Sequence, residues 1–235
     1  MADFNTHIFG AAAVVSLGAT CCTKLLSLDM TEGLMLTVAG MIGGIIPDID
    51  LKQSQPSRAL FSGLGTVAAL VWLFANVQDF TGLELWLGAI TVFLLVRFPV
   101  WWLFHSVTKH RGILHSLIAA VMAGVLMSAV AWQQMETSEL QSWLLGIFMS
   151  TGYLIHLLLD ELYSVDFTGV RVRRSFGSAV KPLDLQQLPA SCLVIFITLV
   201  AWFWTAPYDI AWDQWQALYT DWRPALLPDW VWDNI

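Results

Sequence analysis

The sequence predicts an all-α polytopic membrane protein, built as a bundle of about seven transmembrane helices. The first observation is composition: 57% of the 235 residues are hydrophobic and only 12% are charged, whereas about 25% are charged in an ordinary soluble domain. The second is an aromatic content that includes 13 Trp and 13 Phe. The third is a series of apolar stretches, most of which approach the roughly 20 residues that span a bilayer.

Seven apolar stretches are expected to form helices, over residues 8–28, 32–46, 59–77, 83–104, 113–132, 140–162 and 188–206. The first is expected to be a retained helix, because the basic residues that open a signal peptide are missing. The second is short and carries Gly40, Gly43 and Gly44, whose small size lets helix backbones approach closely in lipid. Pro47 ends it.

The remaining helices are bounded by polar or helix-breaking residues. Pro99 is expected to bend the fourth helix, and nearby Arg97 is expected to extend its side chain toward the interface. A polar stretch over residues 163–187 separates the sixth and seventh helices. We expect residues 1–206 to form the transmembrane domain and residues 207–235 to form an interfacial tail, because Trp at the density seen there suits a membrane surface.

Alternate crossing of the membrane gathers the unusual polar residues on one side. If the first helix leaves the side that holds residue 1, the second, fourth and sixth helices return to it. The groups that then share this side are His7, Asp48 with Asp50, the segment 105–115, and His156 with Asp160. This convergence occurs although the groups are separated by about 150 residues of chain.

Basic residues mark the same side as cytoplasmic. Those assigned to it are Lys52, Arg58, Lys109, Arg111, Arg171, Arg173, Arg174 and Lys181. Only Lys24 and Arg223 are assigned to the opposite side. Since cytoplasmic loops carry an excess of Lys and Arg, we expect the N-terminus in the cytoplasm and a multi-pass protein of the bacterial inner membrane.

Two pairs of residues have the spacing of metal ligands. His156 and Asp160 are four apart on one helix face, where they could share a metal or form a His–carboxylate pair. The alternative is a helix end that simply reaches water. Asp48 and Asp50 repel each other unless a cation or an Arg lies between them, and oxygen ligands of this kind suit Mg²⁺ or Mn²⁺. Here the alternative is a polar turn that caps a helix.

The segment 110–116 combines two imidazoles, a guanidinium and a hydroxyl. If the chain turns at Gly112, Ser116 opens the fifth helix, whose N-terminus suits a phosphoryl oxygen. Arg111 could contact the same group through two hydrogen bonds. We therefore take His110, Arg111 and Ser116 as candidate catalytic residues. His105 could be a ligand or an interfacial residue, and we expect the latter.

These motifs resemble those of a bacterial inner-membrane family, the LexA-regulated, membrane-bound metal-dependent hydrolases. The matching segments are residues 5–10 (NTHIFG), 44–50 (GIIPDID), 110–116 (HRGILHS) and 156–160 (HLLLD), and their order covers residues 1 to about 185. The resemblance implies a metal site built from His7, Asp48, Asp50, His110, His115, His156 and Asp160. Departures are Leu114, where the family commonly has a hydroxyl residue, and a longer, more basic segment after Asp160.

The sequence therefore predicts a hydrolase that holds one or two divalent ions, Zn²⁺, Mn²⁺ or Mg²⁺, at the cytoplasmic helix ends. Its expected partners are membrane lipids and a lipid-like or phosphorylated substrate. Nucleic acid is not expected, since the net charge is −7 and nucleic-acid binding needs basic surfaces. Two alternatives stay open, a metal or proton transporter and a non-enzymatic membrane protein with a structural metal.

Overall fold

A computed structural model describes residues 4–51, 54–107, 112–166, 171–172 and 180–209 of the chain. It confirms the predicted helical membrane fold. Within the described part, six helices are long and apolar enough to cross a membrane, and a seventh is apolar but shorter. The chain forms two compact units, one made of residues 1–47 and 113–235 and the other of residues 48–112.

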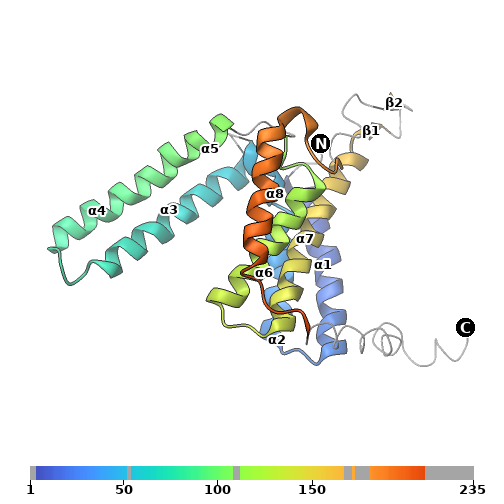
Figure 1. Ribbon diagram of the computed structural model, residues 1–235, viewed down its shortest axis with the longest axis horizontal. Helices are drawn as coiled ribbons and strands as arrows, with labels where there is room; N and C mark the ends of the chain where they lie inside the picture. Colours follow the sequence, from blue (N-terminus) through green and yellow to red (C-terminus); the bar gives the residue numbers. More distant parts are fainter. Residues whose placement is uncertain (1–3, 52–53, 108–111, 167–170, 173–179, 210–235) are drawn as a thin grey trace, which may run out of the picture. The chain divides into compact units, whose positions relative to one another are not determined.

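The first unit is a bundle in which α7 lies at the centre. Its helices are α1 (Phe4–Leu26), α2 (Met30–Gly43), α6 (Leu117–Gln134), α7 (Glu139–Leu162) and α8 (Leu188–Trp202). Helix α7 packs against α1, α2 and α6, while α8 packs against α6 (Figure 1). Two short strands, β1 (Val165–Asp166) and β2 (Arg171–Val172), pair antiparallel after α7, and a 3-10 turn (Leu185–Gln187) leads into α8.

Glycines allow α7 to approach its neighbours closely. A Cβ placed on Gly152 of α7 would lie 1.7 Å from the carbonyl oxygen of Gly40 on α2. A Cβ on Gly43 would lie 2.0 Å from the carbonyl oxygen of Met149. Because van der Waals packing is the main attraction between helices in lipid, these contacts hold α2 against α7, as the small residues of the second helix predicted.

The second unit is a helical hairpin. It contains most of a 3-10 helix (Ile46–Asp50), then α3 (Gln55–Ala75), α4 (Gly82–Leu95) and α5 (Trp101–Val107). Helices α3 and α4 run side by side in opposite directions (Figure 1). The distortion expected at Pro99 is a π-helical turn over Val96–Val100, because proline removes one hydrogen-bond donor from the helical ladder.

Each predicted helix differs from the structure by up to a few residues at its ends, and two of these differences have a clear structural cause. Helix α2 has 14 residues, which gives a length of about 21 Å against roughly 30 Å for the hydrocarbon core, so it is as short as the sequence predicted, but it ends at Gly43 and not at Ile46. It begins at a capping box, in which the Glu32 N–H donates to Asp29 Oδ1 at 2.7 Å. Helix α6 begins at Leu117, because Ser116 takes the N-cap position. The Trp-rich tail lies outside the described residues from residue 210 onward.

Candidate metal centre

Four titratable side chains meet at one end of the first unit, although they come from three separate parts of the chain. His7 lies in the first turns of α1, His115 directly precedes the N-cap of α6, and His156 and Asp160 lie in the last two turns of α7. All four are buried, with exposed fractions of 1% for His7 and 0% for the others. The structure therefore brings together the ends of three helices that the topology trace placed on one side.

Asp160 lies between two of the imidazoles. Its Oδ1 is 3.4 Å from His7 Nε2, and its Oδ2 is 3.5 Å from His115 Nε2. A buried carboxylate is costly unless it is paired with a cation or hydrogen-bonded. The placement of this carboxylate among imidazoles is consistent with that requirement.

The third imidazole completes the cluster. The ring of His156 stacks on that of His7 with centroids 3.7 Å apart, and it meets the His115 ring edge-on at 5.8 Å. One potential ligand atom from each of His7, His156 and Asp160 lies within 4.8 Å of the others. Small side-chain adjustments would bring three such atoms onto one ion, since zinc–nitrogen bonds are about 2.0–2.1 Å long.

A backbone carbonyl orients one imidazole of this cluster, a feature that the sequence analysis missed. The Nδ1–H of His156 donates to the Gly44 carbonyl oxygen at 2.8 Å, so Nε2 carries the lone pair of the neutral ring. Such outer hydrogen bonds commonly set the tautomer of a metal-binding histidine. The residue pattern carries no signal for this partner, because the acceptor is a main-chain atom that only the packing of α2 on α7 brings near.

Tyr153, which is buried on α7, holds the backbone next to His115. Its hydroxyl donates to the carbonyl oxygen of Leu114, the residue before His115. Tyr153 lies three residues before His156 and seven before Asp160, so it shares their helix face. That spacing is the signal that could have identified it from the sequence.

The donor set fits some metals better than others. Three imidazoles and one carboxylate suit Zn²⁺ or Mn²⁺, whereas Mg²⁺ prefers oxygen ligands. Ionisable side chains inside a membrane protein are rare and expensive, and they usually mark a functional site. A buried His/Asp cluster at the ends of spanning helices is therefore a candidate metal centre.

Of the three predicted catalytic residues of the segment 110–116, the structure describes Ser116. Ser116 is buried and caps α6: its hydroxyl donates to the Ile113 carbonyl oxygen at 2.5 Å and accepts from the Ala119 N–H at 3.4 Å. Both contacts shape the turn that presents His115. His110 and Arg111 lie outside the described residues, so their roles stay predictions.

The other predicted ligands, Asp48 and Asp50, belong to the second unit. Both lie in the 3-10 helix Ile46–Asp50 and are buried, with exposed fractions of 8% and 5%. Their membership of the ligand set stays a prediction. His105, which we expected at the interface, is instead buried within the second unit and contacts Ser57.

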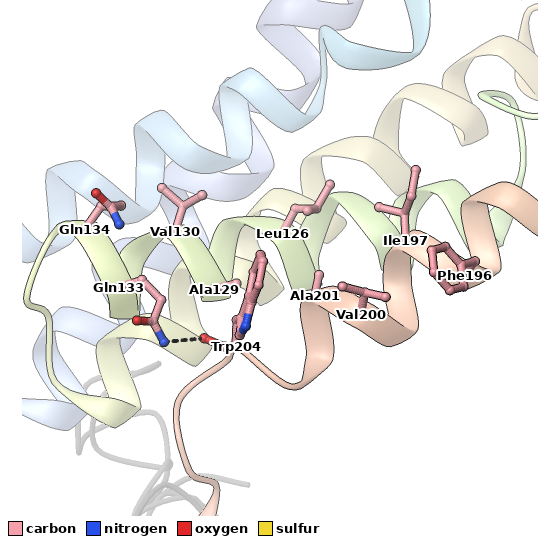
Figure 2. Close-up of a pocket in the computed structure, with 10 residues that line it drawn as sticks. All are labelled: Leu126, Ala129, Val130, Gln133, Gln134, Phe196, Ile197, Val200, Ala201 and Trp204. Carbon is pink, nitrogen blue, oxygen red and sulfur yellow. Dashed lines mark hydrogen bonds between the residues drawn. The ribbon is translucent and has the colours of Figure 1, made fainter.

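A separate hollow of about 370 Å³ lies between α6 and α8. Figure 2 shows that apolar side chains form most of its wall, and that Gln133 donates to the Trp204 carbonyl oxygen at 3.1 Å. Among the described residues that line it, none is titratable. The described lining of this hollow therefore offers no side chain that could bind a metal ion or transfer a proton.

The fold and the cluster define a class: a multi-pass helical membrane protein with buried ionisable residues at its helix ends. The chain belongs to the YdjM inner membrane protein family, whose sequence model matches residues 1–205. This match confirms a bacterial inner-membrane family and extends through α8, beyond the segments on which the resemblance was based. Comparisons with curated proteins and with solved structures give no match.

Proposed function

We propose that this protein is a membrane-embedded, metal-dependent hydrolase that acts on a lipid-like or phosphoester substrate at the cytoplasmic face. The observation that carries the proposal is the buried group of three imidazoles around Asp160, with His156 oriented by a backbone carbonyl. A divalent ion bound there would acidify a water molecule and supply a nucleophile at neutral pH.

Within this proposal the residues of the chain have separate tasks. His7, His115, His156 and Asp160 would hold the ion, and Asp48 and Asp50 are the further ligands that the resemblance implies. Arg111 would stabilise negative charge on a phosphoryl or acyl oxygen with its guanidinium. The first amide groups of α6 do not have this task, because the Leu117 and Ile118 N–H groups already donate to the Lys181 and Pro182 carbonyl oxygens. His110 is the candidate general base if it is not a ligand.

The position of the cluster favours this proposal over transport. A transporter needs polar groups along a route through the membrane. In the spans that the structure describes, no acidic residue or histidine lies in the middle of a helix. The cluster instead lies at helix ends, on the side that the topology trace assigns to the cytoplasm. Control of expression by LexA, which the resemblance implies, belongs to the proposal as well.

Metal analysis of the full-length protein in lipid nanodiscs tests the site. We expect the purified protein to retain Zn²⁺ or Mn²⁺ after dialysis, and His115→Ala and Asp160→Ala to lose it. Ser106→Ala is a suitable control, because this hydroxyl is exposed and donates to the Leu103 carbonyl oxygen of its own helix. Retention of metal by both cluster variants would refute the assignment of the ligands.

Activity separates an enzyme from a protein with a structural metal. The metal-loaded protein is incubated with membrane lipid extracts, and released phosphate and headgroups are measured. We expect release that depends on the metal and is lost in Asp160→Ala. Metal retention without any release would favour the structural alternative, and metal uptake by proteoliposomes would favour the transporter.

A further inference from the structure

The second unit has a buried polar network of its own. It joins His105 on α5, Ser57 on α3 and the 3-10 helix that holds Asp48 and Asp50. His105 is 4% exposed and Ser57 is 0% exposed. Polar groups this deeply buried are costly unless their hydrogen bonds are made.

The His105 ring makes contacts through both nitrogens. Nε2 lies 3.1 Å from the Ile49 carbonyl oxygen and 3.2 Å from Ser57 Oγ, while Nδ1 lies 2.8 Å from the Trp101 carbonyl oxygen. The Trp101 indole N–H donates to Ser57 Oγ at 3.1 Å. Both carbonyl oxygens can only accept, and a neutral ring has one N–H, so the bond to Ile49 forms when Nε2 carries the proton.

Aromatic packing limits the movement of this ring. The His105 ring lies 4.8 Å from the Trp101 ring, 5.1 Å from Phe104 and 5.9 Å from Phe61, measured between centroids. Close packing restricts a side chain to one rotamer, so the position of Nε2 is fixed relative to α3 and α5. A hydrogen bond from a fixed ring also fixes its acceptor.

The acceptor is the peptide group between the two predicted ligands. The Ile49 carbonyl is part of the peptide bond that leads into Asp50, and Asp48 directly precedes Ile49. The turn has a second restraint on its other side, where Ser54 Oγ–H donates to the Asp48 carbonyl oxygen at 2.8 Å. Together the two bonds set the direction in which both carboxylates leave the backbone.

We propose that His105 is a positioning residue that holds the Asp48–Ile49–Asp50 turn in the conformation needed to bind a divalent ion. The inference rests on the proposed function, in which these carboxylates are ligands. Ser57 and Trp101 hold the ring in place through their own hydrogen bonds.

The same contacts could describe a serine nucleophile with a histidine base, because Ser57 Oγ and His105 Nε2 are within hydrogen-bond reach. One observation favours positioning instead. Nε2 also contacts the Ile49 carbonyl oxygen, a contact that has no role in such a pair, whereas positioning explains it.

Two substitutions of similar size separate positioning from general packing. In His105→Gln the amide nitrogen can take the place of Nε2 and keep the bond to Ile49. In His105→Asn the amide reaches only the place of Nδ1, so the Ile49 bond is lost. Ser106→Ala is the neighbouring control. All are compared as full-length protein in nanodiscs, by Mn²⁺ and Zn²⁺ titration and by amide hydrogen exchange of residues 46–51.

We expect His105→Asn to weaken metal binding by about 10- to 100-fold, the usual effect of losing an outer support. We also expect faster exchange at the Leu51 amide, whose N–H donates to the Asp48 carbonyl oxygen at 3.3 Å. His105→Gln should stay close to the unchanged protein in both measurements. Equal effects of the Asn and Gln variants, or no effect of either, would overturn the positioning role.

The two proposals can fail separately. If the unchanged protein binds no divalent ion, the proposed function fails, and the exchange rates measured without metal still decide whether His105 holds the turn. If Asp48→Asn and Asp50→Asn weaken metal binding while His105→Asn does not, the ligands stand and the positioning role is refuted.

Discussion

Substitution of Gly152 by alanine tests the link between helix packing and the candidate site. The new Cβ would lie 1.7 Å from the Gly40 carbonyl oxygen, whereas ordinary contact begins at 3.4 Å. The helices α2 and α7 would therefore have to separate by up to about 1.7 Å, because the obstructing atom belongs to the backbone and cannot rotate away. Overpacking of this kind costs about 1–3 kcal/mol, and we expect a value near the upper end.

The separation should also disturb the cluster. His156 lies one turn beyond Gly152 on the same face of α7, and its Nδ1 is 2.8 Å from the carbonyl oxygen of Gly44 on the α2 side. A shift of this size would stretch the bond beyond hydrogen-bonding distance. We therefore expect Gly152→Ala to lower both the unfolding temperature and the metal affinity.

Thermal unfolding in nanodiscs, combined with metal titration, measures both effects. Gly63→Ala is the matched control, because a Cβ on Gly63 meets nothing within 4 Å and alanine in a helix interior is favoured over glycine by about 0.5–1 kcal/mol. An unchanged melting temperature and metal affinity in Gly152→Ala would show that α2 and α7 do not approach each other in this way.

Three further predictions concern the site and the topology. Tyr153→Phe removes the hydroxyl that bonds to the Leu114 carbonyl oxygen; we expect a metal affinity lower by about 10- to 100-fold, and an unchanged titration would contradict a positioning role for Tyr153. Metal binding should weaken as the pH falls, because imidazoles and carboxylates must lose their protons to bind an ion; equilibrium dialysis at several pH values measures this, and stronger binding at acidic pH would argue against imidazole ligands. A reporter enzyme that works only outside the cytoplasm should be active when it is fused after residue 206, and one that works only in the cytoplasm should be active when it is fused to the N-terminus. The reverse pattern would refute the orientation inferred from the basic residues.

Much of the fold could be predicted from composition and apolar run length. Each long span needs enough apolar residues to satisfy the bilayer, so helices such as α3 and α7 are visible in the sequence alone. The end of α2 was the exception. Its apolar run continues to Ile46, but Gly44 and Pro47 let the backbone leave the helix and form a 3-10 turn, and only packing against α7 shows where that change occurs.

The sequence by itself determined the membrane class, the number of apolar helices and the identity of His7, His115, His156 and Asp160 as the residues of interest. The helices and the pair His156 and Asp160 follow from local chemistry, because hydrophobic runs and i, i+4 spacing depend only on neighbouring residues. His7 was singled out by the topology trace and the family resemblance. The tertiary structure alone decided how these side chains are supported. The Gly44 carbonyl, the Tyr153 hydroxyl and the Ile49 carbonyl bonded to His105 are contacts between distant segments, and such contacts arise only when whole helices pack and bring their ends together.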